Sequence, residues 1–170
     1  EKPFSESERA YWGASGITEE TLHRYGVLSL QEYRSETRDG RPFGFSSTPA
    51  EPMFGYKGKW GMKVYRPKSE LRFVYGGHTG EGYCFGLEQL PSKGDLLFIT
   101  GGEKDVLTLA AHGFHAVCFN SETSPVPQKF LRKVSYRFKH ILLLYDTDKT
   151  GLECSERLVS QLSEYGVKRI

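Results

Sequence analysis

Residues 95–151 read DLLFITGGEKDVLTLAAHGFHAVCFNSETSPVPQKFLRKVSYRFKHILLLYDTDKTG and decide the predicted fold. Short apolar runs, typical of buried strands, alternate here with segments whose apolar residues have helical spacing. The runs are DLLFIT at 95–100, HAVCFN at 115–120, HILLLYD at 140–146 and, just beyond, VKRI at 167–170; the helical segments are 105–112, 128–138 and 152–165. This alternation predicts an α/β fold, with a parallel, Rossmann-like sheet flanked by helices.

The part of the chain before about residue 92 has a different pattern. A short helix is expected over residues 18–25, from Thr18 to a stop at Gly26. Beyond it, short runs of β-forming residues are separated by glycine and proline, which predicts a smaller, strand-rich α+β subdomain. The runs include MKVYR at 62–66, LRFVY at 71–75 and GYCFG at 82–86; GGHTGEG at 76–82 lacks the Gly-Lys-Ser/Thr ending of a phosphate loop and is interpreted as a hairpin turn.

We therefore predict two domains, residues 1–92 and residues 93–170. The closing VKRI resembles an unfinished strand, so we expect the second domain to be truncated at its C-terminal end. Hydrophobic residues make up 38% of the chain and charged residues 26%, as in ordinary globular proteins. The sequence has no apolar run long enough to span a membrane and no signal peptide at its start, so we expect no membrane partner. The three cysteines form no CxxC pair, which fits a reducing compartment, and we expect a cytoplasmic protein.

Basic residues gather in one short segment although the net charge is only +2. Such residues can neutralise phosphates, and aromatic residues between them can stack on bases. A solvated hairpin face explains the same pattern, and both interpretations stay open. The basic residues are Lys57, Lys59, Lys63, Arg66, Lys68 and Arg72, against Glu70, and the interleaved aromatics are Trp60, Tyr65 and Phe73.

Acidic residues follow two of the predicted strands. Asp146 and Asp148 follow the third strand, and the turn TGGEKD at 100–105 follows the first. Functional residues of parallel sheets gather at the carboxyl ends of the strands, and two nearby carboxylates repel each other unless a cation lies between them. The pattern therefore indicates a Mg²⁺ (or Mn²⁺) site, although acids after a strand can also serve only as turn and helix-capping residues.

The motifs ITGGEKDVLTLAAHGFHAVCFNSET and HILLLYDTDKTG resemble the Toprim domain of DnaG-type primases and phage primase-helicases, including the Twinkle branch. The family pattern is Glu-Gly-x-x-Asp after one strand and Asp-x-Asp-x-x-Gly after a later one. The upstream segments SGITEETLHRYGV, KWGMKVYRP and LRFVYGG are similar to the basic subdomain that precedes Toprim in primases. Gly102, Asp105, Asp146, Asp148 and Gly151 fall on the Toprim pattern.

One position departs from the family. The resemblance places a glutamate, proposed to act in acid–base or metal chemistry, immediately before Gly102, where this chain has Gly101. Glu103 lies in the same loop and is a candidate to replace it, but an acid in the first turn of a helix also stabilises the helix dipole. Lys104 has the same two interpretations, a phosphate contact or a solvated helix start.

The resemblance implies a divalent-metal-dependent primase that makes RNA primers from ribonucleoside triphosphates on single-stranded DNA. It implies a helicase or zinc-binding module elsewhere in the parent protein, which would belong to a replication system of a phage or mobile element. The implied catalytic residues are Glu103, Asp146 and Asp148, the metal ligands are Asp105, Asp146 and Asp148, and the nucleic-acid or nucleotide contacts are Lys63, Arg66, Lys68, Arg72 and Lys104.

Three alternatives remain at this stage. A degenerate Toprim domain would bind nucleic acid without synthesis, and Gly101 favours it. Toprim nucleases and topoisomerases are a second class, but no tyrosine nucleophile can be assigned. DTDKT at 146–150 also matches the Asp-x-Asp-x-Thr motif of HAD-type phosphatases, in which the first aspartate attacks phosphate, but that motif normally opens its domain.

Overall fold

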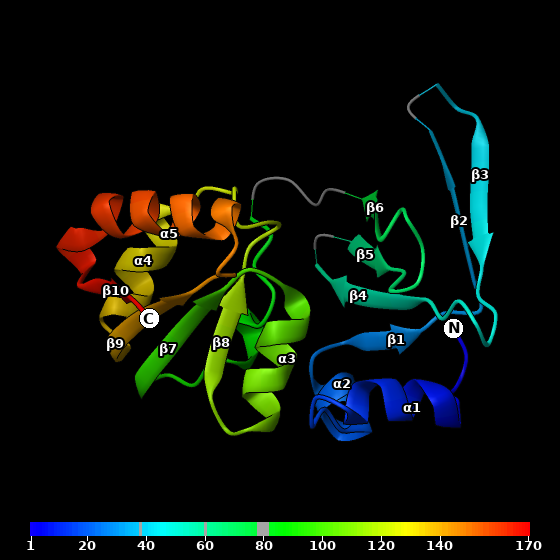
Figure 1. The fold of residues 1–170 in the computed structure, drawn as a ribbon, viewed down its shortest axis with the longest axis horizontal. Coiled ribbons are helices and arrows are strands. Elements are labelled where there is room, and N and C mark those ends of the chain that lie inside the picture. Colours follow the sequence, from blue (N-terminus) through cyan, green and yellow to red (C-terminus); the bar gives the residue numbers. More distant parts are fainter. Residues whose placement is uncertain (38, 60, 78–81) are drawn as a thin grey trace. The chain divides into compact units, whose positions relative to one another are not determined.

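The computed structural model describes residues 1–37, 39–59, 61–77 and 82–170 (Figure 1). The chain forms two compact units, Glu1–Gly82 and Tyr83–Ile170, so the division lies upstream of the one predicted near residue 92. Residues 83–92 belong to the second unit because Phe85 forms a β-bridge with Cys118 and the side chains of Leu87 and Leu90 pack against its core. GYCFG is therefore not a strand, as the sequence suggested, but a segment with one isolated bridge.

The second unit contains the predicted parallel sheet. Its strands are β7 (Gly94–Thr100), β8 (His115–Cys118), β9 (Phe138–Leu144) and β10 (Val167–Arg169), and their order in the sheet is β10-β9-β7-β8. Every pairing between them is parallel. The fold class predicted from the alternating runs is confirmed.

Helices flank this sheet. They are α3 (Glu103–Ala111), α4 (Gln128–Ser135) and α5 (Lys149–Gln161), with short 3₁₀ turns at η1 (Leu87–Gln89) and η2 (Ser163–Tyr165). One buried cluster joins side chains of all four strands to α4 and α5, whereas the buried residues of α3 lie outside this cluster. Figure 1 shows α3 beside β8 and α4 and α5 near β9. Burial of apolar residues between sheet and helices is the main stabilising contribution in such a unit.

The first unit is strand-rich, as predicted. Helices α1 (Glu6–Gly13) and α2 (Glu19–Arg24) accompany an antiparallel sheet of order β1-β4-β5-β6, and β2 (Glu32–Glu36) pairs with β3 (Pro42–Ser46) in a separate two-stranded hairpin (Figure 1). The strands of the sheet are β1 (Val27–Ser29), β4 (Phe54–Gly58), β5 (Gly61–Tyr65) and β6 (Phe73–Gly77).

Local signals explain which elements of this unit were found. The helix expected over residues 18–25 is α2, capped by the Thr18 side chain and followed by Gly26, whose positive φ of 66° suits glycine. The runs MKVYR and LRFVY correspond to the paired strands β5 and β6. The hairpin turn predicted over residues 76–82 lies largely outside the described residues.

Glu8 connects α1 to the rest of the first unit. Its carboxylate is only 3% exposed, lies 2.8 Å from the Lys2 ammonium and accepts hydrogen bonds from the Ser29 hydroxyl and the Ser5 N–H. Burial alone would raise the pKa of Glu8, but the bonds from Lys2, Ser5 and Ser29 outweigh it and the pKa lies below the ordinary 4.5. The ionised carboxylate therefore stabilises the folded unit.

We expect Glu8→Gln to lower the free energy of unfolding by about 1–3 kcal/mol near neutral pH, because the buried ion pair and capping bond are weakened. A lowered pKa stabilises the fold above the unfolded-state pKa, and that contribution is lost as the pH falls through the folded-state pKa. The difference between wild type and Glu8→Gln should therefore shrink below pH of about 4. Urea denaturation across pH measures it, and a constant difference would contradict the role of the charge.

Candidate active site

Three strands of the parallel sheet end side by side. Thr100, the last residue of β7, is in register with Leu144 of β9 and with Cys118 of β8. The strands that follow β7 in the chain lie on opposite sides of it, β8 on one side and β9 on the other. The chain therefore winds in opposite directions away from β7. In open parallel sheets, ligands bind outside the carboxyl ends of the strands at such a change of direction. The turns after β7, β8 and β9 are therefore the elements that would form a site.

The turn after β7 carries Asp105. Gly101 and Gly102 lead into α3, and the backbone N–H of Gly102 donates a hydrogen bond to the Asp105 carboxylate. Partial burial of the carboxyl group, followed by the negative charge of Asp146, raises the pKa of Asp105 above its ordinary value. Asp105 and Asp146 are thus close enough for their charges to repel each other.

The turn after β9 carries the Asp-x-Asp pair, and both side chains are exposed. Asp148 is the N-cap of α5, and its Oδ1 accepts the N–H of Gly151 at 2.8 Å. The capping role that the sequence left open is therefore correct for Asp148. It does not exclude metal binding, because a carboxylate has a second oxygen with its own acceptor sites.

The turn after β8 carries Glu122, which the sequence analysis did not name. Its Oε1 accepts the backbone N–H of Asp146 at 2.9 Å. Partial burial raises the pKa of Glu122, and the charges of Asp146 and Asp148 raise it further, although the bond from Asp146 acts in the opposite direction. The signal that could have found Glu122 is its place after the second strand, since all three strand ends share this edge.

Glu103 and Lys104 begin α3. Glu103 is only 2% exposed, and its Oε1 accepts the Tyr83 hydroxyl at 2.5 Å. These contacts favour the structural interpretation of Glu103, a first-turn acid that stabilises the helix start. The Lys104 side chain is half-buried and makes a non-covalent contact within the protein.

The donor set determines which ion the edge suits. Within the described ranges 1–37, 39–59, 61–77 and 82–170, no group of three or more His, Cys, Asp or Glu side chains is arranged to hold a metal ion by itself. Mg²⁺ commonly uses one or two carboxylates and completes its shell with water and substrate phosphates. The carboxylates of Asp105, Glu122, Asp146 and Asp148 fit such an open site, because they offer oxygen donors and their charges interact.

The basic residues of the first unit differ in exposure. Lys63 is 3% exposed, and its ammonium lies 4.6 Å from the ring centroid of Phe73 and 5.6 Å from that of Tyr75. The guanidinium of Arg66 lies 4.1 Å from the Phe45 ring centroid. Cation–π contacts of this kind stabilise the unit itself, so a nucleic-acid contact by Lys63 would require its withdrawal from the rings.

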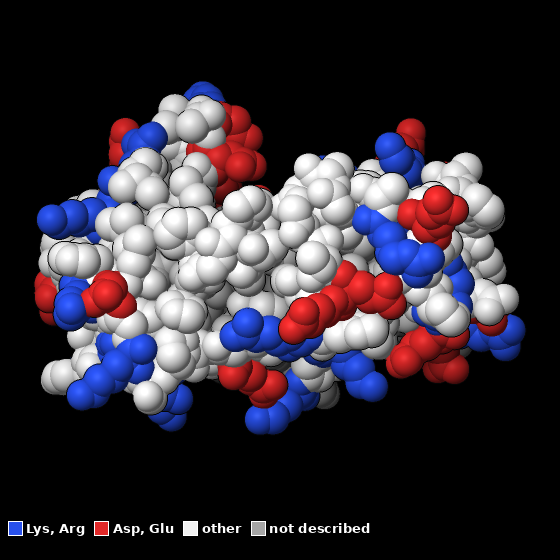
Figure 2. Space-filling view, turned by 90° about the horizontal axis from the view of Figure 1, so that it is seen from below, with Lys and Arg blue, Asp and Glu red and all other residues white. Residues whose placement is uncertain are grey.

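Exposed basic groups remain in the same segment. Lys57, Lys59, Lys68 and Arg72 are exposed, and Trp60 lies outside the described residues. Figure 2 shows Lys and Arg interspersed with Asp and Glu on the face it presents, rather than gathered in a field of one sign.

The difference in exposure gives a testable prediction. We expect Lys68→Ala with Arg72→Ala to flatten the salt dependence of single-stranded DNA binding by about 0.7 units of log K per log salt for each phosphate that the protein no longer neutralises. Lys63→Ala should instead lower the melting temperature, because it removes a buried cation from its aromatic neighbours. Fluorescence anisotropy at several salt concentrations and thermal melting separate the two effects. An unchanged slope in the double variant would show that Lys68 and Arg72 do not contact the phosphates.

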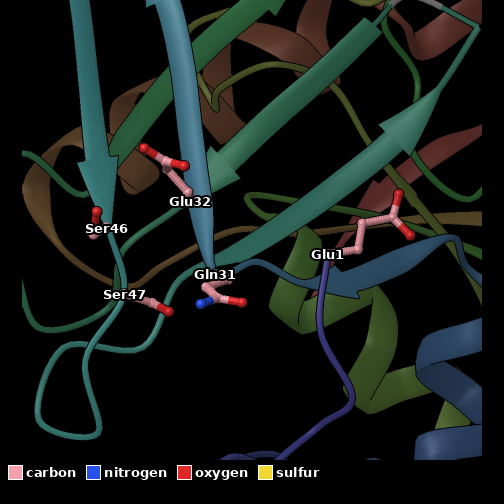
Figure 3. Close-up of a pocket in the computed structure, with 5 residues that line it drawn as sticks. All are labelled: Glu1, Gln31, Glu32, Ser46 and Ser47. Atoms are coloured by element: carbon pink, nitrogen blue, oxygen red, sulfur yellow. The ribbon is translucent and has the colours of Figure 1, made fainter.

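A hollow lies in the first unit. Glu1, Gln31, Glu32, Ser46 and Ser47 line it at the base of the β2–β3 hairpin (Figure 3). Its lining combines two carboxylates with an amide and two hydroxyls, and it contains none of the carboxylates at the strand ends. It therefore adds nothing to the chemistry of the candidate site.

Comparison with known proteins relates this fold to primases. No protein-family model and no curated protein sequence matches the chain. Among solved structures, the DnaG primase catalytic domain bound to ssDNA is similar with a TM-score of 0.65 and 18% identity, over 97% of this chain and 64% of that chain. The primase fragment of the bacteriophage T7 primase-helicase matches with a TM-score of 0.58 and 18% identity, over 92% and 62% of the two chains. The Aquifex aeolicus primase, with its zinc-binding and RNA polymerase domains, matches with a TM-score of 0.62 and 14% identity, over 97% and 49%.

These likenesses show a primase-type catalytic-core fold that includes both units of the chain. The chain spans less than two thirds of the length of each of these three structures. In the described part of the chain, no helix is long and apolar enough to cross a membrane.

Proposed function

We propose that this chain is a metal-dependent nucleotidyltransferase domain of the Toprim type that makes RNA primers on single-stranded DNA. The observation that carries the proposal is the position of Asp105, Asp146 and Asp148 in the turns after β7 and β9 of a primase-type fold, where the charges of Asp105 and Asp146 interact. The likeness extends over the upstream unit as well. A HAD-type phosphatase would not account for that unit.

The carboxylates would hold Mg²⁺ or Mn²⁺ together with the phosphates of the bound nucleotide. When bound, the ion supplies electrostatic stabilisation of charge that develops on the reacting phosphate oxygens. The protein's own contribution is to hold the three aspartates in position. Asp148 is fixed by its cap on α5, the Asp146 backbone is held by Glu122, and Asp105 is held by the Gly102 N–H.

The substrates of the proposed reaction are a single-stranded DNA template and ribonucleoside triphosphates. Exposed Lys68 and Arg72, with Arg66 and Lys104, are the candidate contacts for phosphates. A DnaG catalytic domain with this fold was solved with ssDNA, and T7 primase domains were solved with an RNA/DNA hybrid and dTTP. A helicase or zinc-binding module in the full-length protein would complete the priming system.

A primer-synthesis assay tests the proposal. The full-length protein is incubated with single-stranded DNA and radiolabelled ribonucleotides, with Mg²⁺, with Mn²⁺ or with a chelator. We expect short RNA products that disappear with the chelator. Absence of products under all conditions, with intact single-stranded DNA binding, would exclude primer synthesis.

That negative outcome defines the second candidate, a nucleic-acid-binding module without synthesis. Gly101 favours it, because the family glutamate is missing at this position. The two candidates differ in one measurable respect, since the binding module requires no divalent ion for its contacts with phosphates.

A further inference from the structure

The side chain of Glu122 lies directly over Gly101. A Cβ atom built on Gly101 would lie 2.4 Å from Oε1 of Glu122, 2.9 Å from its Cγ and 3.0 Å from its Cδ. Real Cβ atoms essentially never approach other atoms this closely. The carboxylate of Glu122 therefore occupies the space into which a side chain at position 101 would project.

The same carboxylate contacts the turn after β9. Its Oε1 accepts the N–H of Asp146 at 2.9 Å, although the two residues are 24 positions apart in the sequence. Its charge also interacts with the charges of Asp146 and Asp148. Glu122 thus reaches from the turn after β8 to the aspartates of the proposed metal site.

Glu103 does not have this arrangement. It is nearer to position 101 in the sequence, but its side chain is buried and accepts the Tyr83 hydroxyl. The Cβ built on Gly101 has Glu122, and not Glu103, as its nearest neighbour. Of these two glutamates, it is Glu122 whose carboxylate lies where a side chain at position 101 would lie, and Glu122 also accepts a hydrogen bond from the Asp146 N–H.

We propose that Glu122 supplies the carboxylate that the Toprim resemblance expects at position 101, and that it contributes an oxygen ligand to the divalent ion at this site. This inference rests on the proposed function. The carboxylate enters from the turn after β8 instead of the turn after β7, and glycine at position 101 leaves the room that it needs. Carboxylate oxygen is the donor that Mg²⁺ and Mn²⁺ prefer.

The competing role for Glu122 is purely structural. As a hydrogen-bond acceptor it could hold the backbone of Asp146 and never touch the ion. Glu122→Gln separates the two roles, because the amide oxygen can still accept the Asp146 N–H while the negative charge is lost. A role limited to holding the Asp146 backbone predicts only the small loss of metal affinity that one missing nearby charge causes, and a ligand role predicts a loss of about tenfold or more.

In the first experiment, the full 170-residue chain is titrated with MnCl₂ alone, and binding is monitored by calorimetry and by electron paramagnetic resonance of free Mn²⁺. We expect Glu122→Gln to weaken Mn²⁺ binding about tenfold or more. Glu164→Gln is the matched control, because it removes one exposed charge from η2, beyond the end of α5 opposite to the Asp148 cap, and should leave the affinity unchanged. Mn²⁺ affinity of Glu122→Gln equal to that of wild type would overturn the inference.

The second experiment moves the carboxylate. Gly101→Glu alone places two side chains in one space, and Glu122→Ala alone removes the carboxylate, so each single variant should bind Mn²⁺ about tenfold more weakly. The double variant Gly101→Glu/Glu122→Ala should recover binding to within about threefold of wild type, because the two changes compensate each other. A folded double variant as weak as Glu122→Ala would overturn the inference. Thermal melting establishes folding, and if the double variant does not fold, Glu122→Gln decides.

Asp146→Asn distinguishes failure of this inference from failure of the proposed function. If Asp146→Asn loses Mn²⁺ binding and Glu122→Gln does not, the metal site stands and only the role of Glu122 is overturned. If the wild-type chain binds no Mn²⁺, both are overturned together.

Discussion

Asp146→Asn should reduce primer synthesis by about 100-fold or more and abolish the effect of Mn²⁺ on the protein. Metal ions contribute several kcal/mol to stabilising the charge of a phosphoryl-transfer transition state, and about 2.7 kcal/mol corresponds to a factor of 100. Asparagine has nearly the shape of aspartate, and the backbone N–H that donates to Glu122 is unchanged. The substitution therefore removes charge while leaving the turn after β9 in place.

The stability of the same variant provides the control. The negative charge of Asp146 raises the pKa values of Asp105 and Glu122, which shows that the carboxylates repel one another in the folded unit. Without metal, Asp146→Asn should therefore melt at the same temperature as wild type or higher. Loss of activity with a retained or raised melting temperature would assign the loss to chemistry. Equal Mn²⁺ binding by wild type and Asp146→Asn would refute the proposed site.

The parallel sheet could be predicted because its signals are local. The strands β7, β8 and β9 contain short apolar runs, Gly113 and Gly166 follow the segments that contain α3 and α5, and Pro127 precedes α4. In the first unit the signals are weaker. The helix α1 was missed although Ser5 and Glu8 form a capping box, because the apolar spacing inside it is irregular. The strands β2 and β3 were missed because they are short and half-exposed.

The candidate site was only partly visible in the sequence. Asp146 and Asp148 could be named because a motif and a strand end coincide. Glu122 could not, because its contact with Asp146 depends on the conformation of two turns that are far apart in sequence. The burial of Lys63 could not be predicted from the sequence either. Its place on β5, opposite Tyr75 of β6, determines its burial, and charge clustering alone does not give that register.

Gly151→Ala should have the largest effect on the structure of the site. A Cβ atom at this position would lie 2.1 Å from the carbonyl oxygen of Asp146, 2.8 Å from its carbonyl carbon and 3.1 Å from its nitrogen. All three are backbone atoms, so no side-chain rotation can relieve the contact. Gly151 also donates its N–H to Asp148, which fixes the first turn of α5 to the same segment.

We therefore expect Gly151→Ala to lower the free energy of unfolding of the second unit by about 2–3 kcal/mol, since the turn after β9 must move away from α5. That movement would displace Asp146 from Glu122, so Mn²⁺ binding and primer synthesis should fall together. Gly13→Ala is the matched control. It lies at the end of α1 with no heavy atom within 4 Å of its Cβ position, and alanine there should be neutral or stabilising by up to about 1 kcal/mol.

Urea denaturation and manganese titration of both alanine variants measure these effects. Because Gly13→Ala adds the same methyl group to a helix, it reports the change in helix propensity alone, and the excess effect of Gly151→Ala reports the contact with Asp146. Wild-type stability and wild-type Mn²⁺ affinity in Gly151→Ala would show that the Asp146 backbone can move without consequence. The close packing of α5 against the Asp-x-Asp turn would then have no part in holding the carboxylates at the strand ends.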